Sequence, residues 1–128
     1  MNRVKHALLV ALGGALGALS RYGVASLVLK RFGPGFPLGT LLINITGCAL
    51  IGFFLAAVNG RWAGINSGWE YLVPIGFVGA YTTFSTYEYD LARLMELGAF
   101  KRMAAYFVLS NGVGFAAVLC GIWLGRRV

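Results

Sequence analysis

The segment GFVGAYTTFSTY, residues 76–87, decides how this chain folds. It lies within a long apolar stretch, yet it combines two glycines with four Ser and Thr residues. Paired β-branched threonines that follow glycine are poor helix formers, and Pro74 comes just before them. We therefore predict a helix that breaks near its middle.

The predicted break allows two interpretations. A broken helix leaves backbone carbonyls unpaired, and inside a membrane such groups are tolerated only where a partner satisfies them. An ion is one such partner, and oxygen ligands suit a hard cation. Alternatively the helix continues, and its Ser and Thr hydroxyls bond back to carbonyls one turn earlier. The sequence favours neither interpretation over the other.

Composition identifies the surroundings of this segment as a membrane. The chain has 128 residues, of which 59% are hydrophobic and 12% are charged, and its mean hydropathy is +0.76. A soluble domain carries about 25% charged residues, so neither a soluble nor a disordered chain fits. The net charge of +7 is scattered between apolar runs, which argues against the basic stripe of a nucleic-acid-binding protein.

Four stretches are long and apolar enough to cross a bilayer, which takes about 20 residues each. They cover residues 7–29, 38–58, 71–97 and 103–125, and short polar or Gly-rich loops separate them. We predict an all-α membrane protein with four transmembrane helices in a single domain, residues 1–128. Small residues four apart, Gly13 with Gly17 and Gly121 with Gly125, predict close helix packing.

Basic residues are divided almost evenly between the two ends of these spans. One side carries Arg3, Lys5, Arg61, Arg126 and Arg127, and the other carries Lys30, Arg31, Lys101 and Arg102, with Arg21 and Arg93 nearer the helix ends. The positive-inside rule therefore fixes no orientation. We hypothesise that the chain inserts both ways and that two copies pair as an antiparallel homodimer.

The polar residues within the second and fourth spans are neutral hydrogen-bond donors. Thr40 and Asn44 share one helix face, and so do Tyr106 and Ser110. Each pair either joins helices through hydrogen bonds or lines a path through the membrane. Arg21, late in the first span, either attracts anions to a vestibule or has an interface or structural role, which we favour.

Groups that other functions require are missing from the centres of the spans. The strong acids near a span are Glu88, Asp90 and Glu96, all on the late half of the third. A proton-coupled exporter needs a titratable group at mid-membrane, and a membrane enzyme needs a nucleophile–base pair, carboxylates or metal ligands. We therefore expect a path for a small anion, to which the rings of Phe84 and Tyr87 offer electropositive edges.

Three stretches together resemble the Fluc (CrcB) fluoride channels. They are GALGALSRY at 14–22, GTLLIN at 39–44 and GAYTTFSTY at 79–87, in the family's order and spacing over essentially the whole chain. The TTFST core after a glycine, with GTLxxN upstream, is highly specific. The resemblance implies a dual-topology antiparallel homodimer with four spans per subunit, a third helix broken mid-membrane, and two fluoride pathways along the subunit interface.

The resemblance also implies roles for individual residues. The backbone carbonyls of Gly79 and Thr82, from both subunits, would hold a structural sodium ion on the dimer axis. The fluoride pathway would be lined by Asn44, Phe84, Tyr87, Thr40, Ser85, Thr86, Tyr106 and Ser110, and Arg21 matches the family's first-helix arginine. Three positions depart from the family pattern: Tyr87 adds a hydroxyl to a phenylalanine position, Gly114 stands where some members have serine, and Ala80 replaces the second glycine of the usual Gly-Gly before the break.

The implied job is passive export of fluoride across the inner membrane of a bacterium, which protects the cell from fluoride that enters as neutral hydrogen fluoride. Two other functions remain in competition. A small dual-topology multidrug exporter should carry a membrane-embedded Glu in its first span, and this span has none. A structural subunit of a larger complex would not need the polar centre of the third span.

Overall fold

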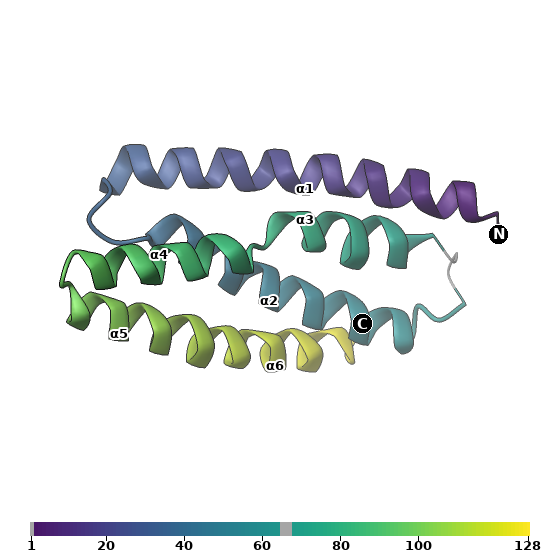
Figure 1. Cartoon of the computed structure of the whole chain (residues 1–128). Helices are drawn as coiled ribbons and strands as arrows, with labels where there is room; N and C mark the ends of the chain where they lie inside the picture. Colours follow the sequence, from purple (N-terminus) through teal and green to yellow (C-terminus); the bar gives the residue numbers. More distant parts are fainter. Residues whose placement is uncertain (1, 65–67) are drawn as a thin grey trace.

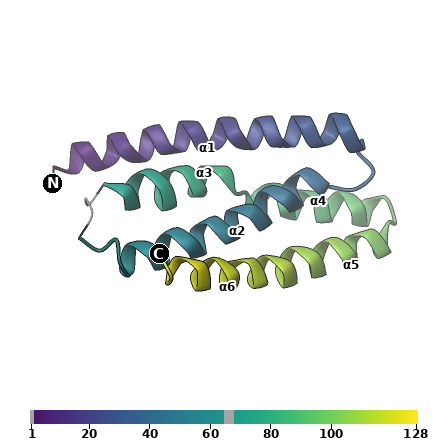
Figure 2. The same cartoon turned by 180° about the vertical axis from the view of Figure 1, so that it is seen from behind.

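The computed structural model describes residues 2–64 and 68–128, and every regular element in these ranges is a helix. The helices form four passes that lie side by side, each running opposite to the one before (Figure 1). Seen from both sides, α1 and the last pass lie at opposite edges of the bundle, with α2 and the third pass between them (Figure 2). The predicted all-helical fold is confirmed.

Two passes are single helices and two are composite. Helix α1 covers Arg3–Phe32, and α2 covers Leu38–Asn59. The third pass consists of the π-helical η1, Tyr71–Val78, the single turn α3, Gly79–Tyr81, and, after a break, α4, Phe84–Glu96. The fourth pass is continuous through α5, Phe100–Val108, the π-helical η2, Leu109–Val113, and α6, Gly114–Gly125.

Three helices in the described ranges are long and apolar enough to cross a membrane, namely Arg3–Phe32, Leu38–Asn59 and Phe100–Gly125. The third predicted span, 71–97, consists of two half-helices, as a helix broken near its middle requires. The predicted break is confirmed, and it lies between Tyr81 and Phe84.

The first helix extends beyond the predicted span, 7–29, at both ends. Its N-cap is Asn2, whose Oδ1 accepts a hydrogen bond of 3.2 Å from the Val4 N–H. It ends where Gly33 takes a φ of 74° and its N–H bonds to the Leu29 carbonyl at 2.9 Å, a conformation that glycine adopts without steric cost. The apolar run therefore predicted only the central part of α1, because charged residues can continue a helix beyond its apolar segment.

Glycines allow the backbones of neighbouring passes to touch, as the four-residue spacing predicted. A Cβ atom on Gly13 or Gly17 of α1 would collide with backbone atoms of η1. A Cβ atom on Gly121 or Gly125 of α6 would collide with backbone atoms of α2. Two pairs of passes, α1 with η1 and α2 with α6, are thus held at a separation that only glycine permits.

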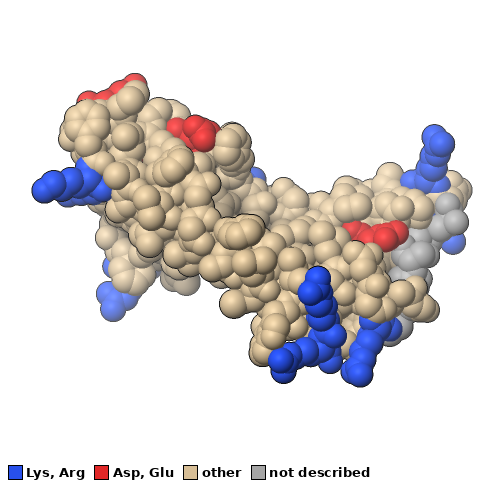
Figure 3. Space-filling view, turned by 90° about the horizontal axis from the view of Figure 1, so that it is seen from below, with Lys and Arg blue, Asp and Glu red and all other residues tan. Residues whose placement is uncertain are grey.

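Charged side chains lie on both halves of the molecule, and a wide uncharged surface separates them (Figure 3). Arg61 Nη1 donates to the Arg127 carbonyl at 3.4 Å, and Arg102 Nη1 donates to the Gly35 carbonyl at 3.1 Å. These bonds agree with the predicted grouping of the second loop with the C-terminus and of the first loop with the third. The second loop, predicted at 59–70, lies partly outside the described residues.

Candidate functional site

The third pass breaks at two threonines. Thr82 (φ −78°, ψ 158°) and Thr83 (φ −149°, ψ 112°) are extended, and Thr83 is the N-cap of α4. Thr83 Oγ1 accepts a hydrogen bond of 3.2 Å from the Thr86 N–H and donates one of 2.9 Å to Thr86 Oγ1. Thr83 was not among the predicted site residues, although a threonine just ahead of an amphipathic helix is an N-cap signal.

A side-chain amide on α2 holds the peptide group at the break. Asn44 Oδ1 accepts a hydrogen bond of 2.8 Å from the Thr83 N–H, and Asn44 Nδ2 donates one of 3.1 Å to the Thr83 carbonyl. We call these two bonds the Asn44 clamp. The interhelical hydrogen bond considered for Asn44 is therefore present, and the second Nδ2 proton remains available for another acceptor.

The break leaves two backbone carbonyls without their helical partners. In an uninterrupted α-helix, the N–H groups of residues 83 and 86 would bond to the carbonyls of Gly79 and Thr82. Here the Asn44 clamp takes the first N–H, and the Thr83 hydroxyl takes the second. No other backbone donor in the described part of the chain reaches either carbonyl. Thr82 Oγ1 also bonds back to the Val78 carbonyl at 3.0 Å, so one hydroxyl of the segment makes the predicted bond back to an earlier carbonyl although the helix does not continue.

The part of α2 that faces the break needs a residue without a side chain. A Cβ atom on Gly47 would collide with the methyl group of Thr82. That methyl group cannot rotate away cheaply, because the hydroxyl on the same carbon bonds to the Val78 carbonyl. On the same side of the break, the hydroxyls of Thr46 and Tyr81 share a hydrogen bond of 2.9 Å. With the Asn44 clamp on Thr83, helix α2 therefore contacts both ends of the broken segment.

Aromatic rings form a row that starts beside the break. The ring centroids of Phe84 and Tyr87 are 6.0 Å apart, those of Tyr87 and Tyr106 are 5.2 Å apart, and those of Tyr106 and Phe36 are 5.7 Å apart. Phe84 is 73% exposed, whereas Tyr87 is 6% exposed and Tyr106 is fully buried. The row therefore runs from the surface of the subunit into its core, where Tyr87 and Tyr106 pack with Leu41.

The two tyrosines of the row use their hydroxyls differently. Tyr106 donates its proton to Asp90 Oδ2 at 3.1 Å. Tyr87 accepts a hydrogen bond of 2.9 Å from Asn111 Nδ2. Asp90 and Asn111 were not among the predicted site residues. The available signals were that Asp90 lies three residues after Tyr87, on the same helix face, and that Asn111 directly follows Ser110.

Two pockets lie along this part of the chain. One, of about 310 Å³, opens at the break and is lined by α2 and the third pass, including Asn44 and Phe84. The other, of about 240 Å³, lies at the start of α2 and includes Thr40, Asp90 and Arg93. Since Thr40 and Asn44 are one turn apart on α2, the two pockets follow the same helix.

The remaining predicted site residues lie in different surroundings. Ser85 is exposed, with its hydroxyl oxygen 3.4 Å from that of Thr83, and Thr86 is half-buried. Ser110 Oγ is buried and has no hydrogen-bond partner within the described ranges. Arg21 is half-buried and lines neither pocket.

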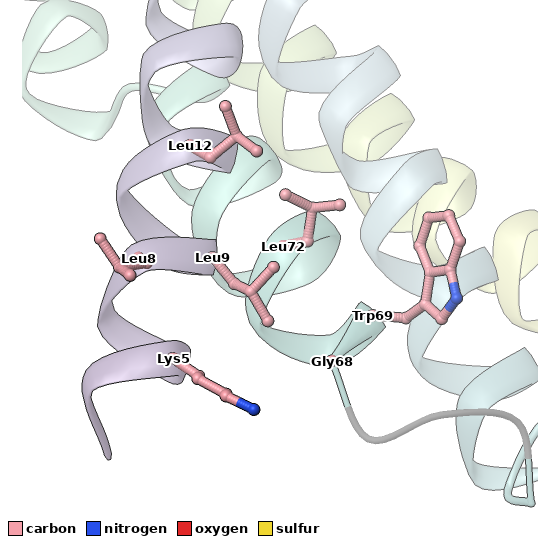
Figure 4. A pocket seen from close by; sticks show the side chains of 7 residues that line it. All are labelled: Lys5, Leu8, Leu9, Leu12, Gly68, Trp69 and Leu72. Carbon is pink, nitrogen blue, oxygen red and sulfur yellow. The ribbon is translucent and has the colours of Figure 1, made fainter. Parts of the chain in front are cut away.

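A third pocket, of about 500 Å³, lies away from the break at the start of α1 (Figure 4). Leucines line most of it, Trp69 stands at one side, and Lys5 supplies the charged group. It contains no constellation of donors, so the arrangement of neutral donors and rings at the break remains the candidate site.

Comparison with known proteins gives concordant results. The family model described as CrcB-like protein, Camphor Resistance (CrcB), matches residues 8–122. The fluoride-specific ion channel FluC of Acidobacterium capsulatum is 45% identical over 119 residues, covering 93% of this chain and 94% of the relative. The protein of the same name from Trichormus variabilis is 45% identical over 123 residues, covering 96% and 90%. That from Rhizobium meliloti is 41% identical over 125 residues, covering 98% and 99%.

Proposed function

The chain belongs to the CrcB-like protein family, and on this premise we propose that it is a fluoride-specific ion channel that lets fluoride leave the cell passively. It is a multi-pass protein of the bacterial membrane, with long apolar helices, and it is an ion channel rather than an enzyme. Its job is fluoride resistance, because hydrogen fluoride crosses bilayers as a neutral acid and ionises in a near-neutral cytoplasm. A passive channel then releases the trapped anion down its gradient.

The observation that carries this proposal is the row of neutral donors and aromatic rings beside the break. Fluoride is small and strongly hydrated, so a pathway must replace its water with N–H and O–H donors and ring edges at close range. Asn44 has an amide proton with no acceptor among the described residues, and the exposed ring of Phe84 lines the same pocket. Thr40, Ser85, Thr86, Tyr87, Tyr106 and Ser110 extend the same pathway, with Arg21 at a vestibule or in a structural role.

The two unpaired carbonyls at the break support a structural sodium ion. A backbone carbonyl is an oxygen ligand of the kind that a hard cation prefers, and Gly79 and Thr82 each offer one. The described residues contain no cluster of three or more His, Cys, Asp or Glu side chains, so backbone oxygens are the donors that this site supplies. Replacing sodium with a large organic cation should lower the thermal stability of the purified protein, and unchanged stability would contradict this assignment.

A second copy of the chain completes the pathway. The pocket at the break is lined by α2 and the third pass and is open to the surface, and Phe84, one of its lining residues, is 73% exposed. The nearly even division of basic residues between the two ends fits an antiparallel homodimer, since neither orientation is favoured. If tags on the two termini report a single orientation in the bacterial inner membrane, the antiparallel arrangement is wrong.

Reconstitution into liposomes tests the pathway directly. The purified protein should release fluoride, measured with a fluoride electrode, without a proton gradient, and it should release no chloride at a comparable rate. Phe84→Ile should lower fluoride flux roughly fivefold, because the ring edge contributes about 1 kcal/mol that an aliphatic side chain does not.

Phe115→Ile is the matched control for this experiment. Phe115 is 67% exposed, much like Phe84, but it lies on α6 and lines none of the three described pockets. The control should conduct like the unmodified protein. Chloride release at a comparable rate would defeat the fluoride assignment, and equal flux for Phe84→Ile and Phe115→Ile would remove Phe84 from the pathway.

A further inference from the structure

The side chain of Asn111 has a fixed orientation. Its Nδ2 donates to the Phe107 carbonyl at 2.9 Å and to the Tyr87 hydroxyl oxygen at 2.9 Å. A backbone carbonyl can only accept hydrogen bonds, so the atom that faces Phe107 must be the amide nitrogen. That nitrogen has two protons, and these two bonds use both.

This orientation decides what the Tyr87 hydroxyl does. An amide nitrogen does not accept hydrogen bonds, so the Tyr87 oxygen is the acceptor and its own proton points elsewhere. No acceptor for that proton occurs among the hydrogen bonds of the described residues. Since Tyr87 is only 6% exposed, its hydroxyl is a buried donor. Asn111 orients this hydroxyl, but its proton has no acceptor among the described residues.

A second hydroxyl close to Asn111 is also unused. Ser110 Oγ is buried and has no hydrogen-bond partner within the described ranges. It directly precedes Asn111 and lies one turn after Tyr106, whose ring packs against that of Tyr87. Tyr106, by contrast, gives its proton to Asp90. Of the Tyr87, Ser110 and Tyr106 hydroxyls, the first two therefore have protons without an acceptor among the described residues.

Buried donors without acceptors are costly unless a ligand satisfies them. We propose that the Tyr87 hydroxyl donates a hydrogen bond to fluoride during its passage and that Asn111 is the positioning residue that aims this proton. The inference rests on the proposed function and deepens it, because it adds a donor to a position where the resemblance supplied only a ring. The neighbouring ring of Phe84, whose centroid is 6.0 Å from that of Tyr87, would contact the same ion.

The test compares fluoride flux over a range of fluoride concentrations in liposomes. Tyr87→Phe removes only the hydroxyl and should raise the fluoride concentration for half-maximal flux roughly tenfold, the value of one hydrogen bond to a charged group. Asn111→Leu should raise it by a smaller factor, because the hydroxyl remains but is no longer aimed. The double variant should match Tyr87→Phe, since Asn111 acts only through that hydroxyl.

Tyr89→Phe is the matched control, because Tyr89 lies on the same helix, is 64% exposed and loses the same atom. It should leave the half-saturating concentration unchanged. An unchanged value for Tyr87→Phe would overturn the inference while the channel function stands, and so would a further increase in the double variant. If Tyr87→Phe fails to fold, Asn111→Leu carries the test alone, because Asn111 is exposed and its replacement leaves the core intact. A wild-type protein that releases no fluoride would overturn the proposed function as well.

Discussion

The two halves of the third pass are built in different ways. The first half, η1 with α3, packs its backbone against α1, where Gly13 and Gly17 admit no side chain. The second half, α4, is held by side chains: Tyr87 and Leu94 join a core cluster with residues of α2 and α5. The first half is apolar, whereas the second carries most of the donors and rings of the site.

Because of this difference, one half of the pass positions the carbonyl of Gly79 and the other half positions the rings of Phe84 and Tyr87. A single straight helix would have to do both. Backbone packing fixes the first half in depth and rotation, and with it the carbonyl of Gly79. In the second half, side-chain packing buries Tyr87 in the core and leaves the ring of Phe84 exposed. The Asn44 clamp joins the two halves, because it holds the peptide group of Thr83 at the boundary.

The largest effect should come from filling the glycine contact of the first half. Gly17→Val should destabilise the protein by more than about 4 kcal/mol, because its side chain would collide with the backbone of η1 and neither helix can move far. Thermal unfolding in detergent, followed by intrinsic tryptophan fluorescence, measures the loss. Gly23→Val on the same helix is the control, since a Cβ atom there meets nothing within 4 Å. Equal stability of the two variants would show that the first half is not anchored by its backbone.

Removing the clamp should have the next largest effect. Asn44→Leu deletes two hydrogen bonds to Thr83, each contributing roughly 1 kcal/mol, and should lower stability by about 2 kcal/mol. Fluoride flux should also fall, because α4 loses its fixed attachment to α2. Asn59→Leu, at the exposed end of α2, is the matched control for the substitution. A variant at position 44 with normal flux and stability would mean that the two halves stay aligned without the clamp.

The smallest predicted losses of stability concern the two threonines at the break. Thr83→Val removes the N-cap of α4 and should cost about 1 kcal/mol. Thr82→Val keeps the methyl group that faces Gly47 and removes only a bond back to the Val78 carbonyl, so its cost should be about half as large or less. Thermal unfolding of both variants side by side gives the comparison. The reverse order would place the boundary between the two halves one residue earlier.

Much of the fold could be predicted from the sequence because a membrane imposes simple rules. Apolar length marked the passes, and the Gly and Thr residues at 76–87 marked the break. The ends of the helices were harder to predict, since α1 continues through charged residues until Gly33 takes a positive φ. The π-helical turns in the third and fourth passes were not expected, because they depend on how each pass fits its neighbours.

The candidate site was predictable in its residue types and less so in its contacts. Spacing correctly placed Thr40 and Asn44 on one helix, yet it could not show that Asn44 bonds to the backbone of Thr83, 39 residues away. Helical periodicity put Phe84 and Tyr87 together, but only tertiary packing shows that one is exposed and the other buried. Whether these residues contact fluoride stays a prediction.

The contact between Gly47 and Thr82 limits how this protein can change over evolutionary time. Neither residue can be enlarged alone, because the methyl group of one occupies the space where the other would place a Cβ atom. A lineage that acquires alanine at position 47 must first accept a smaller residue at position 82, and the reverse order passes through an intermediate that does not fold well. The two positions should therefore drift as a pair, although 35 residues of sequence separate them.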